Sequence, residues 1–152
     1  MIELANFTDH KDILAVIEQS ILSCVADHQN DPKTIEAWLS NKTPDQLEIW
    51  LQQHIGYSYK VDNRVQGFIL FSASGYIFLN YVSPKHQGHG IGSALLKTTI
   101  KHLNTLQVSM LRVESTLTAA SFYEKSGFVC TETIYENQQP CAYAMEKDLV
   151  RT

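Results

Sequence analysis

The chain has 152 residues and a formal net charge of −4 at pH 7, with 44% hydrophobic and 18% charged residues. This length suits a single domain over residues 1–152, and the composition is that of an ordinary globular protein. The acidic balance argues against a nucleic-acid partner, because such binding needs clustered Lys and Arg. We expect no membrane span and a cytoplasmic protein, since no apolar run approaches the ~20 residues that cross a bilayer and the N-terminus shows no leader pattern.

The cysteines and histidines give no sign of a metal site. Cys24, Cys130 and Cys141 are odd in number and lack a CxxC spacing, so we expect buried free thiols and neither a disulfide framework nor zinc binding. His86 and His89 form a close pair, but neither a cysteine nor a carboxylate stands beside them. We therefore expect no metal cofactor.

The first part of the chain predicts a strand and then a helix. Apolar residues alternate over residues 1–7, which is the period of a half-buried strand. From Asp9 the period lengthens to that of one helix face, and the polar stretch 27–31 is expected to end this helix. The apolar face expected to be buried holds Ile13, Val16, Ile17, Ile21 and Cys24.

Two further helix starts follow in the N-terminal third. Asp31 and Pro32 form a pair of N-cap and first-turn residues. Thr43, Pro44 and Gln46 form a start of the capping-box type. The side chains expected on the inner faces of these two helices are Ile35, Trp38, Leu39, Leu47, Trp50, Leu51 and Ile55.

The middle of the chain predicts an antiparallel meander of three strands. Residues 57–61, 65–73 and 76–82 have strand-like apolar patterns, and turn residues at 62–63 and 74–75 separate them. Strands joined by such short turns pair with their neighbours in sequence.

The rest of the chain alternates helices and strands. Its patterns predict a helix over about 87–104, a strand over 109–115, a short helix over 117–126, and strands over 128–135 and 141–149. Taken with the meander, this order predicts an α+β (mixed α/β) fold.

The stretch "QGHGIGSALL", which begins at Gln87, predicts an anion site. It follows a strand and opens a helix, whose first N–H groups have no internal partners and whose dipole favours negative charge. At Gly90 and Gly92 a Cβ is expected to hinder the close approach of a phosphate. The alternative is that the glycines merely shape a tight turn, although Gly in a first helical turn costs ~1 kcal/mol relative to Ala.

Two familiar phosphate motifs fit this stretch poorly. The P-loop needs a Lys that is absent here. A dinucleotide fingerprint would use Gly88 and Gly90, with Ser93 in place of its third glycine and Glu114 as its acidic residue. That motif opens a parallel βαβ unit, whereas here it follows an antiparallel meander, and too little chain remains to complete such a sheet.

Two motifs together resemble the GNAT superfamily of acyl-CoA-dependent N-acetyltransferases. The family's phosphate turn has the form (Arg or Gln)-x-x-Gly-x-(Gly or Ala), and a second element has the form Ala-x-x-Phe-Tyr-x-x-x-Gly-Phe. Both occur here, about thirty residues apart, so that together they are far more specific than either alone. The matching residues are Gln87, Gly90 and Gly92 in the turn, and Ala119, Phe122, Tyr123, Gly127 and Phe128 in the second element.

The resemblance implies a GNAT-like fold, which is a central mixed, mostly antiparallel sheet with splayed parallel central strands and helices on both faces. It also implies acetyl-CoA as co-substrate. The strand ending at Tyr81 and Val82 would pair with the pantetheine arm, and the N–H groups of residues 87–92 would hold the pyrophosphate. The residues implied to bind acetyl-CoA are Tyr81, Val82, Gln87, Gly88, His89, Gly90, Ile91, Gly92, Ser93, Thr116 and Lys125.

The sequence gives further information on two of these residues, Thr116 and Lys125. Thr116 stands where many family members carry an Asn that contacts the cofactor arm, so a shorter contact is implied. Lys125 is expected on the surface of the short helix, where it either reaches the 3′-phosphate of CoA or is simply solvated.

The resemblance implies an N-acetyltransferase in which a primary amine, of a small molecule or a protein, attacks the thioester directly in a ternary complex. Tyr123 has the family's position for the acid that assists the leaving thiolate. An amine of Lys type has a pKa of ~10.4, so it must lose a proton before attack. The base is unassigned, and Asp27, His28 and Glu114 are weak candidates.

Other points stay open at this level. The strand "YIFLNYV" has no carboxylate, which keeps a non-catalytic acyl-CoA-binding or sensing module as the alternative function. Trp38, Tyr57 and Tyr81, with the acidic balance, would suit a cationic amine acceptor. A homodimer through an exposed edge strand is possible, and neither the acceptor nor a preference for a longer acyl group is specified.

Overall fold

The computed structural model describes residues 1–149 and contains one seven-stranded sheet with the strand order β1-β2-β3-β4-β5-β7-β6. All neighbouring strands are antiparallel except β4 and β5, which are parallel. The strands are β1 (Ile2–Leu4), β2 (Ile55–Val61), β3 (Arg64–Phe71), β4 (Tyr76–Val82), β5 (Met110–Thr116), β6 (Val129–Glu136) and β7 (Gln139–Asp148).

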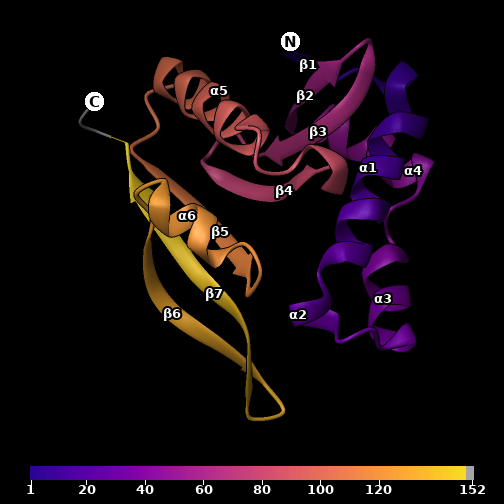
Figure 1. The fold of residues 1–152 in the computed structure, drawn as a ribbon. Helices are drawn as coiled ribbons and strands as arrows, with labels where there is room; N and C mark the ends of the chain where they lie inside the picture. The colour runs from indigo at the N-terminus through magenta and orange to yellow at the C-terminus, as the bar shows by residue number, and fades with distance from the viewer. Residues whose placement is uncertain (150–152) are drawn as a thin grey trace.

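Helices cover both faces of this sheet (Figure 1). α5 and α6 pack on one face, while α1 and α4 pack on the other and α3 lies against α1. Mixed α+β architecture with a mostly antiparallel sheet is therefore confirmed. The helices are α1 (His10–Ser23), α2 (Val25–His28), α3 (Pro32–Leu39), α4 (Pro44–Gln53), α5 (Ile91–Thr105) and α6 (Ala120–Lys125), with 3₁₀ turns at Phe7–Asp9 and Pro84–His86.

The helix starts show which local signals decide the boundaries. The Thr43 hydroxyl accepts a hydrogen bond from the Gln46 N–H at 3.2 Å, so α4 begins at the predicted cap. α5 begins at Ile91 and not near Gln87, because Gly88 and Gly90 have φ values of 80° and 81° in the left-handed region. The polar stretch 27–31 was expected to end the first helix, but the short helix α2 runs into it.

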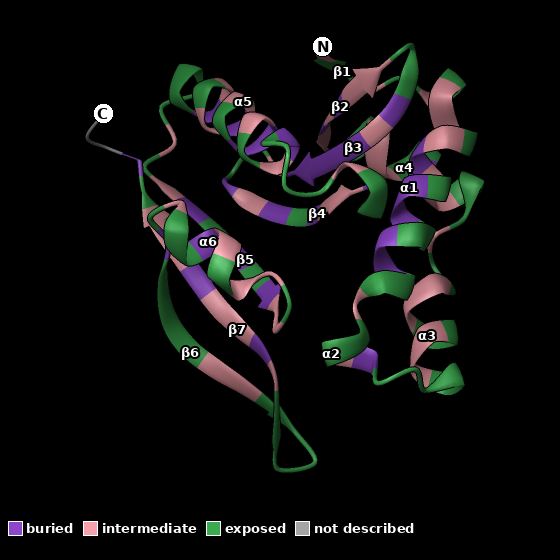
Figure 2. Cartoon of the chain, in the orientation of Figure 1, coloured by how far each residue is buried: buried purple, intermediate pink, exposed green. Residues whose placement is uncertain are grey.

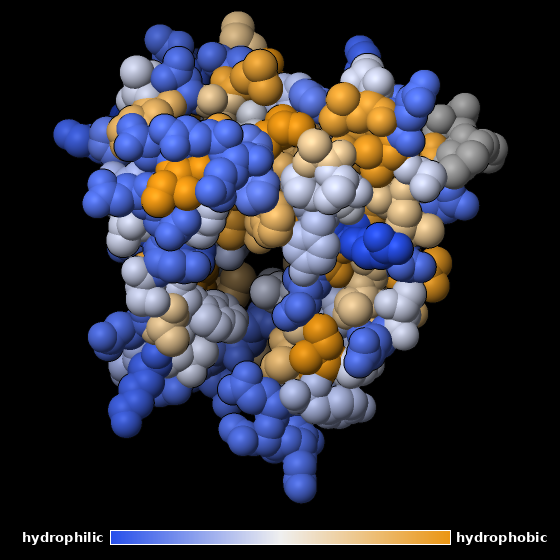
Figure 3. Space-filling model, turned by 180° about the vertical axis from the view of Figure 1, so that it is seen from behind, coloured by the Kyte–Doolittle hydropathy of each residue, from blue (hydrophilic) through white to orange (hydrophobic). Residues whose placement is uncertain are grey.

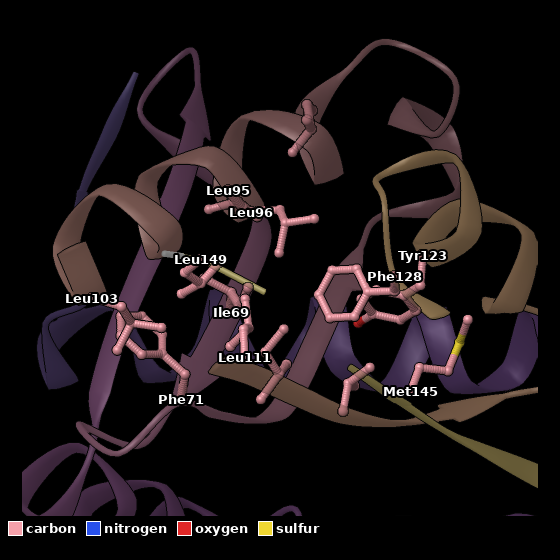
Figure 4. Packing of buried hydrophobic residues seen from close by; sticks show 13 residues of the cluster. Ile69, Phe71, Leu95, Leu96, Leu103, Leu111, Tyr123, Phe128, Met145 and Leu149 are labelled. Carbon is pink, nitrogen blue, oxygen red and sulfur yellow. The ribbon is translucent and has the colours of Figure 1, made fainter. Parts of the chain in front are cut away.

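Two hydrophobic cores lie on opposite faces of the sheet. Figure 2 colours the buried residues along the chain, and Figure 4 shows the side chains of the first core. The first core, under α5 and α6, includes Ile69 and Phe71 of β3, whereas the second core, under α1 and α4, includes Phe68 and Leu70. Alternate residues of β3 therefore enter different cores, which explains why this strand is an unbroken apolar run in the sequence.

The cysteines are the expectation that the fold overturns. All three are free, as expected, but Cys130 is exposed and Cys24 and Cys141 are only half-buried. Cys130 lies on β6, an edge strand whose residues are mostly exposed, so the fold offers it no core to enter.

The two parallel strands separate soon after they meet. β4 and β5 pair only at Tyr76 with Arg112 and Ile77 with Val113. At the next position a β-bulge leaves Phe78 without a register partner on β3, since Phe71 pairs with Ile77 and Leu70 with Leu79. From Phe78 onward β4 therefore has a free edge toward β5, as the resemblance implied, and Figure 1 shows the two strands diverging.

No helix within residues 1–149 combines the length and the apolar character needed to cross a membrane.

Candidate active site

A cavity of about 540 Å³, called the main cavity here, fills the space where β4 and β5 diverge. Its walls are residues 77–82 of β4, residues 113–116 of β5, most of residues 86–93, and side chains from α1 and α6. Seen from behind, the surface is hollowed between the side that carries α1 and α3 and the side that carries β6 and β7 (Figure 3). Tyr123 and most of the residues implied to bind acetyl-CoA line this cavity, whereas His89 and Lys125, and the candidate bases Asp27 and His28, do not.

The glycine turn forms one end of the main cavity. The first hydrogen bond within α5 runs from the Ala94 N–H to the Gly90 carbonyl at 3.0 Å. The N–H groups of Ile91, Gly92 and Ser93 therefore have no partner inside the helix, and these three residues line the cavity. Free N–H groups at a helix start favour an anion, so the turn fits a phosphate group of CoA.

Different physical reasons favour glycine at the three glycine positions of the turn. A Cβ at Gly88 or Gly90 would meet no atom within 4 Å, so their positive φ is what favours glycine. At Gly92 a Cβ would approach the Phe122 ring at 3.3 Å, so this glycine lets α5 and α6 pack closely. Close packing of these two helices is therefore a reason for Gly92 besides the one expected from the sequence.

Gln87 and Ile91 support the turn from behind. The Gln87 side-chain amide donates a hydrogen bond to the Val82 carbonyl at 3.3 Å, which ties the turn to the end of β4. The Ile91 side chain is 4% exposed and belongs to the first core, so only its backbone is available at the cavity surface.

Tyr123 has a buried hydroxyl that meets one polar side chain of β4. The residue is 4% exposed and packs against Phe128 in the first core (Figure 4). The Asn80 side-chain amide donates to its hydroxyl oxygen at 3.2 Å, while the Asn80 Oδ1 atom is buried without a partner. Burial raises the pKa of Tyr123 to about 12, against a smaller lowering by the Asn80 hydrogen bond, so the phenol is protonated at neutral pH.

The groups around Tyr123 are mostly neutral. Burial raises the pKa of Tyr81 to about 12, with smaller contributions from Cys24 and Tyr123. Burial also raises the pKa of the Cys24 thiol, and the nearby carboxylate of Asp27 adds to this effect. Both groups therefore keep their protons at neutral pH, and Cys24 is a poor nucleophile.

Asp27 has a structural task in this fold. Its carboxylate accepts hydrogen bonds from the Leu117 N–H at 2.6 Å, from the Thr118 N–H at 3.2 Å and from the Thr118 hydroxyl. These bonds tie α2 to the segment between β5 and α6 across the sheet's split. Asp27 thus holds two distant segments of the chain together.

His28 is also occupied. It is 2% exposed, its Nε2 atom lies 2.9 Å from the Ile21 carbonyl, and its Nδ1 atom accepts from the Asn30 N–H at 2.9 Å. This pattern assigns the proton to Nε2 and leaves no free ring nitrogen, so His28 cannot act as a base in this arrangement. Glu114 is different, because it is exposed and lines the main cavity.

Thr116 and Lys125 differ in their position relative to the main cavity. The Thr116 side chain lines the main cavity, but its oxygen accepts a hydrogen bond from the Ala119 N–H at 3.2 Å and so supports the start of α6. Lys125 is exposed on α6 and does not line the cavity.

A second cavity of about 500 Å³, called the side cavity here, opens on the other side of β4. Trp38 of α3 and Trp50 of α4 contribute to its walls, together with Lys42 and His54. Tyr57, which was grouped with the possible acceptor-site aromatics, lies elsewhere and bonds through its hydroxyl to His102 at 2.8 Å. The two cavities share Cys24, Phe78, Leu79, Tyr81 and Thr116, so they meet at the bulge of β4.

Sequence reasoning missed two features of this site. Asn80 is a polar residue in an otherwise apolar strand, and that contrast is a signal that could have identified it. The side cavity depends on how α3 and α4 pack against β4, and no local pattern predicts such a meeting of distant segments.

Comparisons with known proteins agree with this geometry. The family model described as "Acetyltransferase (GNAT) domain" matches residues 25–149. The curated Escherichia coli (strain K12) protein named "Uncharacterized N-acetyltransferase YafP" is 24% identical, over 92% of this chain and 87% of that protein.

Solved structures show the same fold. A GCN5-related N-acetyltransferase from Rhodopseudomonas palustris superposes with a TM-score of 0.85 at 22% identity, covering 97% of this chain and 94% of that one. The PaiA N-acetyltransferase from Thermoplasma acidophilum, solved in complex with coenzyme A, gives a TM-score of 0.80 at 19% identity, covering 97% and 99%. With the family model spanning most of its length, the chain belongs to the GNAT family and is an acetyl-CoA-dependent acyltransferase.

Proposed function

We propose that the protein transfers an acetyl group from acetyl-CoA to a primary amine by direct attack within a ternary complex. The observation that carries this proposal is the meeting of the two cavities at the bulge of β4, with Tyr123 in the wall of the main cavity. Donor and acceptor can then be bound at once, one in each cavity. The raised pKa of the Cys24 thiol supports the same view, because a protonated thiol does not form an acetyl-enzyme.

The main cavity suits the donor. The free N–H groups of residues 91–93 would hold the pyrophosphate, and the unpaired edge of β4 from Phe78 onward offers backbone groups to the amide-bearing arm. Lys125 lies outside this cavity and His89 is exposed, so both have weaker support as contacts of the cofactor.

In the proposed reaction the amine nitrogen bonds to the thioester carbonyl carbon, the C–S bond breaks, and CoA leaves as a thiolate. Tyr123 would donate its hydroxyl hydrogen bond to the leaving sulfur. Its pKa of about 12 lies well above the ~8.5 of a model thiol, so the phenol stabilises the thiolate by a hydrogen bond and keeps its proton. Because Asn80 donates to the phenol oxygen, the single O–H of Tyr123 is left to point toward the cavity.

The amine must also lose a proton before or during attack. Glu114 is the only carboxylate among the described residues that line either cavity. It is exposed and in contact with solvent, so we assign it the uptake of this proton, directly or through a water molecule.

The decisive test of the function measures release of the CoA thiol from acetyl-CoA with a panel of primary amines. We expect at least one amine to accelerate release well above the rate of hydrolysis. If acetyl-CoA stabilises the protein against heat but no amine accelerates release, the protein is an acyl-CoA-binding module instead. Stabilisation by NAD and not by acetyl-CoA would favour a nucleotide-binding module.

The assembly and the compartment are further proposals. β6 is an edge strand with Val129 and Tyr135 exposed at 66% and 64%, which supports a homodimer formed along this edge. The three free thiols, one of them exposed, support a reducing compartment such as the cytoplasm. Sedimentation of the purified chain tests the first proposal.

A further inference from the structure

The side cavity has a mixed aromatic and apolar wall. Trp38, Trp50, Phe78 and Tyr81 contribute aromatic surface, and Leu79 and Ile21 contribute aliphatic surface. No Asp or Glu occurs among the described residues that line it. A wall of this kind suits the apolar body of a small molecule, and its volume is within the usual range for such ligands.

Lys42 is the one Lys or Arg among the described residues of this wall. Its ammonium donates to the Trp38 carbonyl at 2.8 Å and to the Asn41 side-chain oxygen at 2.6 Å. Both partners are neutral, and they fix the position of the ammonium. These two bonds use two of its three N–H groups, so the third can donate to a ligand.

The Lys42 ammonium lacks a counter-ion in the described part of the chain. Partial burial lowers the pKa of Lys42, and no carboxylate among the described residues lies close enough to raise it again. The ion pairs of the fold use Lys60, Arg64 and Arg112 instead. A half-buried cation without an opposite charge is unfavourable, and a carboxylate brought by a ligand would offset that cost.

The charge of the wall also argues against some acceptors. A polyamine, an aminoglycoside or a lysine-rich protein segment carries several ammonium groups. Carboxylates would favour the binding of those groups, but none lines this wall among the described residues, and Lys42 presents a charge of the same sign. The wall therefore disfavours the cationic acceptor expected from the acidic balance of the whole chain.

We propose that the side cavity selects an acceptor that joins a primary amine to a carboxylate and an apolar body, as an apolar amino acid does, with Lys42 binding the carboxylate. This inference rests on the acetyltransferase function proposed above. In this arrangement the apolar body lies against Trp38 and Trp50, and the amine faces the junction with the main cavity at Phe78 and Tyr81.

The test compares amines that differ by one carboxylate. Release of the CoA thiol from acetyl-CoA is measured with phenylalanine and 2-phenylethylamine, with tryptophan and tryptamine, and with leucine and isoamylamine. Spermidine and kanamycin represent the polycationic class. We expect kcat/KM to be roughly tenfold or more higher for at least one amino acid than for its decarboxylated partner, as for a hydrogen bond between charged groups.

Variants of Lys42 test whether its side chain causes the preference for an amine that carries a carboxylate. Lys42→Met is expected to lower kcat/KM for the amino acid and so remove the preference over its decarboxylated partner, and Lys42→Arg is expected to retain the preference. Lys33→Met is the matched control, because Lys33 is exposed on α3 and does not line the cavity. Thermal stabilisation by acetyl-CoA should be the same in all four proteins, which shows that the donor site is intact.

The outcomes separate the two proposals. If polycations or decarboxylated amines are acetylated in preference, or if Lys42→Met leaves the preference unchanged, the inference is overturned while the acetyltransferase proposal stands. If no amine of any class accelerates thiol release, both are overturned.

Discussion

At the scale of single residues, the pair formed by Tyr123 and Asn80 concentrates the proposed chemistry. The Tyr123 hydroxyl is buried in the wall of the main cavity, and Asn80 donates to it. Tyr123→Phe removes only the hydroxyl. We expect kcat to fall roughly tenfold to a hundredfold, because the leaving thiolate loses its donor, while the Kd for acetyl-CoA changes little. Steady-state kinetics with a binding titration checks this, and an unchanged kcat would remove Tyr123 from the mechanism.

Asn80 gives a second prediction at this scale, in which stability and activity change in opposite directions. Its Oδ1 atom is buried without a partner, and such an atom costs about 1–3 kcal/mol. Asn80→Leu has a similar volume, so the free energy of unfolding should stay equal or increase while turnover falls. In the double variant with Tyr123→Phe, turnover should fall no further than in Tyr123→Phe alone. Urea unfolding and kinetics measure both effects, and additive losses would contradict a shared role.

At the scale of elements, the glycine turn is proposed to bind acetyl-CoA through its backbone N–H groups. Gly90 has a φ of 81°, a conformation that costs an L-residue roughly 1–2 kcal/mol. Gly90→Ala should therefore lower the free energy of unfolding by about this amount and also weaken acetyl-CoA binding, because the turn presents the free N–H groups of α5.

The matched control for this variant is Gly127→Ala. Gly127 has a φ of 95° but lies after α6 and does not line the main cavity. This variant should lose a similar amount of stability and keep its affinity for acetyl-CoA. Equal loss of affinity in both variants would mean that the turn has no special part in binding.

Asp27 links two elements that are far apart in the sequence. Its carboxylate accepts hydrogen bonds from the segment that leads into α6. A hydrogen bond to a charged group contributes roughly 1.5–3 kcal/mol to the free energy of unfolding. Asp27→Ala should lower the free energy of unfolding by about 1–3 kcal/mol, measured by urea denaturation. The exposed Asp45→Ala, on α4, is the control and should change stability by less than about 0.5 kcal/mol. A stable Asp27→Ala protein with lost activity would instead revive Asp27 as a base.

Much of the element order could be predicted because it depends on local patterns. The second core is specified by Ile13, Val16 and Ile17 at helical spacing, and the meander by its period of two. The start of α5 was placed too early because the left-handed φ of Gly88 and Gly90 ends the helical pattern without changing the apolar spacing.

The site was predicted less completely for a different reason. The glycine turn and Tyr123 lie in local motifs, so the sequence identified them. Lys42 acquires its place only when the segment after α3 packs beside β4, and the task of Asp27 depends on a partner 90 residues away. Such long-range contacts leave no periodic trace in the chain.

At the scale of the whole molecule, the buried tyrosines make stability depend on alkaline pH. Tyr81 and Tyr123 have pKa values of about 12 in the folded protein, because burial raises them above the ordinary tyrosine value of about 10. Below pH 10 both states hold these protons and stability is unaffected. Between pH 10 and 12 the unfolded chain loses them first, so stability falls, by on the order of 2–3 kcal/mol for each tyrosine.

This pH dependence has a direct measurement. Urea unfolding at pH 9 and at pH 11.5 should show a loss for the unmodified protein that is smaller in the double variant Tyr81→Phe and Tyr123→Phe. The same loss in both proteins would assign the alkaline effect to other groups.

The ternary complex, with donor and acceptor meeting at the bulge of β4, is the central feature of the proposed reaction. Initial velocities measured over a matrix of acetyl-CoA and acceptor concentrations test it most directly. The two-cavity arrangement predicts double-reciprocal lines that intersect and no release of the CoA thiol without an acceptor. Parallel lines, with a stoichiometric burst of thiol from acetyl-CoA alone, would show an acetyl-enzyme and contradict direct attack.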